Sequence, residues 1–294
     1  MEGNIETVLQ RDEFFSIAKQ LPFLDLMNLC ASSKIINNLI CLRDDIWNVK
    51  LNTEFSSFQL PGNISKKDLY ILTLIKERYK IILTYYDIYK HYSTSQELNL
   101  SASFKNSSFP LEITYLSNLK NLNLSNNNIE SLPKEIGNLI NLTTLILHHN
   151  HLTELPSSFS KLINLESLYL GNNNFVIFPK EIFKLSNLKT LYFFHNLLQT
   201  IPKEIEQLKN LQILHLNQNK LLFLPEEIGN LPNLGMLNIT DNKILALPKN
   251  FENLKNLKFL DYNYITNKEI LQMKLKLPHV MFTEKKKTNI PMYI

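Results

Sequence analysis

The chain has 294 residues, of which 44% are hydrophobic, and a formal net charge of +4 at pH 7. This composition supports a folded core, and the length suits one extended domain with a small extra module. The mild positive charge comes from lysines that alternate with glutamates, as in Lys134-Glu135 and Lys180-Glu181. A nucleic-acid-binding protein is therefore not expected, because no basic patch forms.

Residues 1–50 carry apolar side chains at helical spacing and show no internal repeat. The spacing predicts three short helices, with a break between the first two at Pro22 and with Asp25 in the first turn of the second. We expect a small all-α helical module here.

Residues 51–94 are predicted to form a loop and a linker helix. Pro61-Gly62 marks a turn, and Ser65 followed by Asp68 approximates the capping box that begins a helix. The following residues place apolar side chains along one helical stripe.

Residues 95–262 are organised by a 23-residue period. Leucines, asparagines and prolines each keep this spacing, so the pattern cannot come from composition alone. The columns are Leu116, Leu139, Leu162, Leu185, Leu208, Leu231 and Leu254; Asn127, Asn150, Asn173, Asn196, Asn219 and Asn242; and Pro133, Pro156, Pro179, Pro202, Pro225 and Pro248. A sustained period of this length predicts a solenoid.

Within one repeat, each residue type has a structural task. Leu122 and Leu124 are spaced two apart, which predicts that they point inward from a short strand. Pro133 ends the extended pattern and suits a turn into a short helical segment. One coil cannot close its own core, so stacked neighbours are needed.

The period stops after Tyr262, and residues 263–294 are predicted to form a C-terminal cap and tail. Residues 268–276 read as a helix that ends before Pro278. Residues 279–282 read as a last strand.

The repeated pattern resembles the leucine-rich repeat family, in its 23-residue subclass with Leu-Pro in the second half of the repeat. The resemblance implies an α+β repeat protein, a solenoid with a parallel sheet on its concave face. It also implies that Asn127 and its equivalents are buried and hydrogen-bond backbone groups of neighbouring coils.

In such a solenoid the strand residues between the inward leucines face the concave side. Aromatic and histidine side chains gather in the middle coils, and small polar residues lie toward both ends. The predicted partner-binding residues are Ile146, His148, His149, Tyr169, Tyr192, Phe194, His195 and His215. Aromatic centres with polar rims are typical of protein-binding hot spots. The alternative is that these columns tolerate many residue types and that the cluster arose by sequence drift without a binding function.

The four concave histidines do not predict a metal site, because no cysteine or carboxylate joins them. A pH-sensitive interface is a milder alternative.

Residues 1–50 also resemble an F-box, although the opening Leu-Pro of that family is missing. The matching residues are Phe14, Phe15, Ile17, Leu21, Asp25, Leu26, Leu29, Ser33, Leu39, Asp44, Asp45 and Trp47. The resemblance implies that this module docks a Skp-type adaptor of a cullin ubiquitin ligase, through a surface that includes Leu21, Pro22, Leu24 and Leu26. The concave face would then hold a target protein.

The alternative function is a stand-alone scaffold or signalling regulator whose N-terminal helices only cap the solenoid. No catalytic motif occurs, so we expect no enzyme activity and no cofactor. We expect a monomer with protein partners and no membrane contact. The absence of a signal peptide and the two cysteines outside the repeats favour the cytoplasm or nucleus. Heavy use of Asn, Lys and Ile indicates an AT-rich genome, as in the large DNA viruses of protists, so the cell would be the host's if the chain is viral.

Overall fold

The computed structural model describes residues 96–103 and 109–285 and, before them, Leu21, Leu26, Trp47, Lys50, Ser65, 67–68 and 70–72. The chain divides into two compact units, Met1–Ser93 and Thr94–Ile294. The predicted module borders within residues 1–94, together with Pro22 and Leu24, lie outside the described residues.

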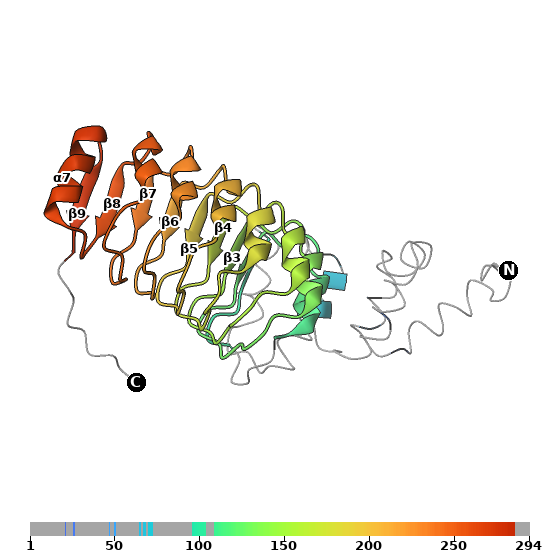
Figure 1. The fold of residues 1–294 in the computed structure, drawn as a ribbon. Helices are drawn as coiled ribbons and strands as arrows, with labels where there is room; N and C mark the ends of the chain where they lie inside the picture. The colour runs from blue at the N-terminus through green and yellow to red at the C-terminus, as the bar shows by residue number, and fades with distance from the viewer. Residues whose placement is uncertain are drawn as a thin grey trace, which may run out of the picture. The chain divides into compact units, whose positions relative to one another are not determined.

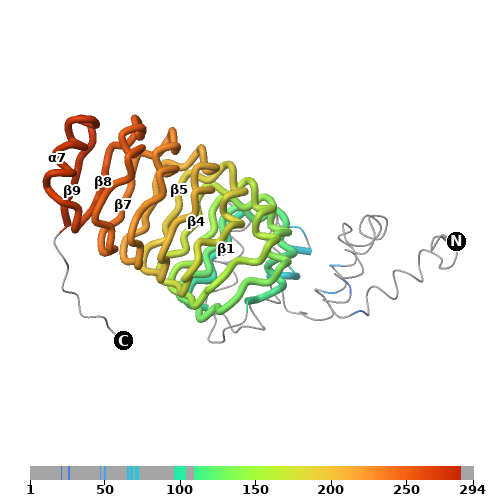
Figure 2. Tube along the Cα trace, in the orientation of Figure 1, coloured from blue at the N-terminus to red at the C-terminus, as the bar shows by residue number. Residues whose placement is uncertain are grey.

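The second unit is built on one parallel sheet of nine strands whose spatial order follows the sequence (Figures 1 and 2). The strands are β1 (Glu97–Asn99), β2 (Asn121–Asn123), β3 (Thr144–Ile146), β4 (Ser167–Tyr169), β5 (Thr190–Tyr192), β6 (Ile213–His215), β7 (Met236–Asn238), β8 (Phe259–Tyr262) and β9 (Met281–Glu284). Each coil therefore contributes one strand, and the predicted solenoid with a parallel sheet is confirmed.

Short 3-10 helices lie on the side of the coils opposite the strands (Figure 1). They are η3 (Leu111–Tyr115), η4 (Lys134–Asn138), η5 (Ser157–Lys161), η6 (Lys180–Lys184), η7 (Lys203–Gln207), η8 (Glu226–Asn230) and η9 (Lys249–Asn253). A proline at the N-cap precedes every one of them; Pro133 has φ −70° and ψ 154°. The fixed φ of proline pre-sets the entry into the helix, as the sequence predicted.

The core lies between the strands and the 3-10 helices. Leu119, Leu122 and Leu124 are fully or almost fully buried, and Ile129 and Ile136 close the same coil from the other side. Burying one such side chain stabilises the fold by about 1.5–3 kcal/mol. Because the pattern repeats in each coil, the core is continuous along the whole stack.

The buried asparagines join successive coils, as the family resemblance implied. Asn173 donates from Nδ2 to the carbonyl oxygens of Leu147 (3.0 Å) and Leu170 (3.1 Å). Its Oδ1 accepts from the backbone N–H of Leu152 at 3.0 Å. Backbone groups left inside the turn are thereby satisfied, which avoids the cost of unpaired buried polar groups.

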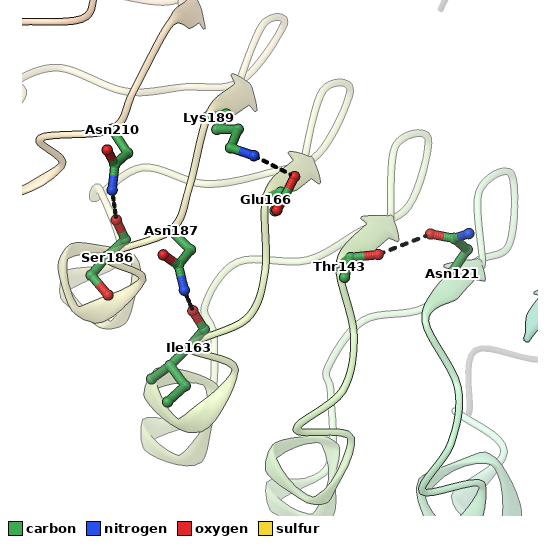
Figure 3. A network of polar contacts seen from close by, with 8 residues as sticks. All are labelled: Asn121, Thr143, Ile163, Glu166, Ser186, Asn187, Lys189 and Asn210. Atoms are coloured by element: carbon green, nitrogen blue, oxygen red, sulfur yellow. Dashed lines mark hydrogen bonds and ion pairs between the residues drawn. The ribbon is translucent and has the colours of Figure 1, made fainter.

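A second, exposed polar ladder joins the coils where the chain enters each strand (Figure 3). Asn187 Nδ2 donates to the carbonyl oxygen of Ile163 at 2.9 Å, and Asn210 Nδ2 donates to that of Ser186 at 2.8 Å. An ion pair between Lys189 Nζ and a Glu166 carboxylate oxygen, 2.8 Å apart, adds a further link. These contacts lie in solvent and contribute less than the buried ones.

The C-terminal cap closes the last coil. Helix α7 (Asn267–Lys276) begins at Thr266, whose side chain accepts from the N–H of Glu269. The Glu269 carboxylate accepts from the N–H of Leu247 at 2.8 Å and so ties the helix to the preceding coil. The predicted helix is confirmed, but β9 begins two residues later than predicted, because Val280 N–H bonds to the Leu277 carbonyl in a turn.

In the N-terminal unit the described residues Leu26, Trp47, Lys50 and Tyr70 are helical and buried. The Trp47 and Tyr70 rings lie 5.7 Å apart, and Lys50 Nζ donates to the Leu21 carbonyl oxygen at 2.7 Å. Ser65 Oγ accepts from the Asp68 N–H at 3.1 Å, which confirms the predicted helix start.

Candidate partner-binding surface

The strand face is the exposed surface of the parallel sheet, which is predicted to be concave. Its central column runs in the predicted register: Ile146 pairs with Tyr169, Tyr169 with Tyr192, and Tyr192 with His215. Parallel strands lie about 4.8 Å apart, so these side chains are direct neighbours. Asn123 precedes this run and Asn238 follows it.

Three rings of this column are packed together. The Tyr169 and Tyr192 rings are stacked, with centroids 5.0 Å and planes 8° apart. The His215 ring meets Tyr192 edge-on at 4.5 Å, and its Nε2 lies 3.3 Å from Met236 Sδ. All three rings are half-buried, so each keeps a surface for a ligand.

Phe194 belongs to the same cluster through a contact with a glycine of the previous coil. A Cβ placed on Gly171 would lie 2.6 Å from the Phe194 ring, so the ring occupies the space that glycine leaves. The ring also meets Tyr192 edge-on at 6.4 Å. Tyr169, Tyr192, Phe194 and His215 are thus one contiguous group, packed on each other.

The other predicted histidines are less tightly joined to this group. His148 is half-buried and its ring lies 5.4 Å from that of the exposed His149. The Nε2 atom of His149 lies 3.3 Å from Asn172 Nδ2. His195 is exposed on the same face.

His149 and His195 occupy backbone positions with positive φ, at 54° and 52°. Asn126, Asn172 and Asp241 stand at the equivalent positions of other coils, also with positive φ. Asn, Asp and His are enriched in this conformation. The backbone conformation is therefore a second explanation for His149 and His195 at these positions, although Gln218 adopts the same conformation. The sequence analysis did not predict it.

Burial shifts the titration of the cluster. It lowers the pKa of His148, and the neighbouring His149 lowers it further. Burial also lowers the pKa of His215, against an opposing effect of Asp261. For Tyr192, burial and then Tyr169 raise the pKa. The centre of the surface therefore favours uncharged side chains.

A second column on the strand face was not predicted. The residue before each inward leucine also faces this side, since strand side chains alternate. Ile213, Met236 and Phe259 lie in register there, and Phe259 is 39% exposed. The apolar surface therefore extends beyond the predicted residues toward β8.

Within residues 96–103 and 109–285 and the single residues described before them, no three His, Cys, Asp or Glu side chains are grouped as metal ligands. No helix among the described residues is both long and apolar enough to cross a bilayer. The predictions of no metal and no membrane contact stay predictions.

Stacked coils with one strand each, an internal asparagine ladder and an open sheet face define a solenoid repeat protein. The model of the leucine-rich repeat region family matches residues 92–221 and 180–280. The chain belongs to the leucine-rich repeat family, whose repeats serve as protein-interaction modules. No curated protein matches the chain.

Solved structures agree with this assignment. A leucine-rich-repeat protein of Leptospira interrogans is 32% identical, with a TM-score of 0.50 over 63% of this chain and 59% of that one. Internalin C2 of Listeria monocytogenes is 25% identical, with a TM-score of 0.57 over 73% of this chain and 92% of that one. The plant peptide hormone receptor RGFR1 in complex with RGF2 is 31% identical, with a TM-score of 0.50. The chain spans 59% of the Leptospira protein and 29% of the plant receptor.

Proposed function

We propose that the strand face binds a protein partner, with Tyr192 at the centre of the contact. The observation that carries this proposal is the packed group of Tyr169, Tyr192, Phe194 and His215 on a face that has no core to fill. Rigid aromatic side chains bury much area for little lost entropy, so they dominate protein interfaces.

The surroundings of this group support the same function. Asn123 and Asn238 flank it in the central column, and Asn217 lies beside His215 on the same face. An apolar centre with amide groups around it matches the usual anatomy of interfaces. The plant peptide hormone receptor RGFR1, to which the chain is similar, was solved in complex with RGF2, which supports a protein or peptide ligand for this chain.

A photo-cross-linking side chain at position 192 tests the proposal, with one at Lys203 as the matched control. Both positions belong to the same coil, but Lys203 lies exposed on η7, on the opposite side. In extracts of the cell in which the chain is made, position 192 should cross-link one defined protein that position 203 does not. Equal cross-linking from both positions would contradict a strand-face interface.

We further propose that the N-terminal unit docks a Skp-type adaptor, so that the chain recruits its target to a cullin ubiquitin ligase in the cytoplasm or nucleus. The support is the F-box resemblance of residues 1–50 alone. Among the proposed docking residues, Leu26 is fully buried and Leu21 half-buried, so Leu26 is unsuitable for a surface mutation. The stand-alone scaffold remains the alternative.

Binding of the full chain to a purified Skp-type adaptor tests this second proposal. Saturable binding that Leu24→Asp abolishes, while the thermal unfolding of the solenoid is unchanged, would support it. The absence of binding by the unmodified chain would favour the stand-alone scaffold.

A further inference from the structure

The flank of the solenoid is the segment of each coil between the buried asparagine and the proline. Backbone hydrogen bonds hold the flanks of successive coils side by side: Lys220 N–H donates to the Leu198 oxygen at 2.9 Å, and Lys243 N–H to the Leu221 oxygen at 2.8 Å. Equivalent side chains therefore form rows along the flank, as they form columns on the strand face.

Large apolar side chains are exposed on the flank of the last two complete coils. Leu222 is 58% exposed, Phe223 54% and Leu245 66%. Tyr264, in the next coil, is 46% exposed. Contiguous apolar surface of this kind marks interaction sites on soluble proteins.

Equivalent positions in other coils of the chain show which residues the fold accepts there. The first two complete coils carry Glu130 and Ser131, and Thr153 and Glu154, at the places of Leu222 and Phe223. All four polar side chains are exposed. The fold therefore does not require apolar residues at this row.

The third coil also exposes apolar side chains at these positions, Val176 and Ile177. The fourth coil carries Gln199 and Thr200 there, which separates this pair from Leu222. The contiguous apolar row is thus confined to the C-terminal end of the flank.

An open groove of about 550 Å³ lies at this end. Its apolar walls come from Leu222, Leu245 and Tyr264, and its polar lining residues are Asn219, Asp241, Asn242 and Lys243. A groove of this size accepts one or two side chains of a partner.

Cationic side chains border the apolar row. Lys220 and Lys243 are exposed, stand two residues before Leu222 and Leu245, and form no ion pair among the described residues. The one carboxylate of the groove, Asp241, accepts from Asn263 Nδ2 at 3.1 Å. Two lysines against this one carboxylate give the groove and its border a net positive charge.

We propose that this flank groove is a second docking surface, for a partner segment that carries an aliphatic side chain and a carboxylate two residues apart. The aliphatic side chain enters between Leu222, Leu245 and Tyr264, and the carboxylate pairs with Lys220 or Lys243. The groove shares no lining residue with Tyr169, Tyr192, Phe194 or His215, so a partner could occupy both surfaces at once or either alone.

Synthetic octapeptide pools test this proposal with the full chain. One pool has Leu-x-Asp fixed at its centre, a second has Leu-x-Lys and a third has Asn-x-Asp, with all other positions mixed. The chain should retain the Leu-x-Asp pool about tenfold better than the other two. Raising the salt concentration should reduce the retention, because the lysines are exposed.

The variant Leu222→Gln with Leu245→Thr should lose this retention by about tenfold or more. Gln and Thr already occupy this position in other coils, as Gln199 and Thr153. The variant should therefore unfold at the same temperature as the parent chain. The strand-face variant Tyr192→Asn should retain the Leu-x-Asp pool as well as the parent chain does. A failure of the flank proposal can therefore be told apart from a failure of the strand-face proposal.

Equal retention of the three pools, or unchanged retention by the flank variant, would overturn the proposal. Concentration-dependent dimerisation that the flank variant abolishes would also overturn it, because the groove would then belong to a second copy of the chain.

Discussion

Tyr169 and Tyr192 lie face to face on neighbouring strands, with ring planes 8° apart. Stacked pairs of this kind contribute about 0.5–1.5 kcal/mol beyond the area that they bury. A double-mutant cycle with Tyr169→Asn and Tyr192→Asn should therefore give a coupling free energy of about 1 kcal/mol in chemical unfolding. Asn is chosen because Asn123 and Asn238 occupy this column elsewhere. Additive effects of the two changes would show that the stack forms no stabilising contact.

Two glycines with crowded surroundings should respond differently to alanine. At Gly171 the new Cβ would meet the Phe194 ring, which is the mobile end of a side chain. At Gly229 it would lie 2.1 Å from the backbone oxygen of Asn250, which cannot move without shifting the coil. We expect Gly229→Ala to lower the free energy of unfolding by about 1–3 kcal/mol and Gly171→Ala by less.

The Gly171→Ala variant has a second expected effect, since it displaces the Phe194 ring from the aromatic group. Partner binding should weaken while the melting temperature changes little. A melting temperature that falls as far as in Gly229→Ala would contradict the expectation that the Phe194 ring moves aside for the new Cβ.

The two asparagine ladders should differ in strength. Asn173→Ala leaves the buried Leu152 N–H without its acceptor, while the carbonyl oxygens of Leu147 and Leu170 keep Asn150 and Asn196 as donors. An unsatisfied buried group costs about 1–3 kcal/mol, so the loss should lie in this range. Asn187→Ala removes one exposed hydrogen bond and should cost less than about 1 kcal/mol. Urea unfolding of both variants measures the difference; similar losses would refute the ranking.

Stability should fall as the solution becomes acidic. The pKa values of His148 and His215 are lowered in the folded chain, so below the ordinary value of about 6.5 the unfolded chain binds more protons. This part of the stability is complete above pH 6.5 and decreases as the pH falls toward the folded-state values. The groups facing the two rings are His149 for His148, and Asp261, Tyr192 and Met236 for His215.

The free energy of unfolding, measured between pH 7.5 and 5, checks this expectation. The variant with His148→Asn and His215→Asn should lose less stability over this interval than the parent chain. A steeper loss in the variant would mean that the two histidines gain protons on folding.

The strand register could be predicted from the sequence, because a fixed period gives every residue a fixed place in the coil. The asparagine ladder was implied by the resemblance to the leucine-rich repeat family. The column of Ile213 and Met236 was not predicted, because its members in the preceding coils, Asn121, Thr144, Ser167 and Thr190, are polar and show no apolar pattern. The positive φ of His149 and His195 was missed because backbone conformation leaves only a weak trace in side-chain type. Phe194 lying over Gly171 is a packing detail between coils that no periodicity encodes.

The affinity of the protein cross-linked from position 192 tests the central claim most directly, measured by calorimetry with the parent chain and with Tyr192→Asn. The account predicts that Tyr192→Asn weakens binding by about thirtyfold or more, as expected of a central hot-spot residue, while Lys203→Ala leaves it unchanged. Equal affinity of the parent chain and Tyr192→Asn would contradict a strand-face interface centred on the stacked tyrosines.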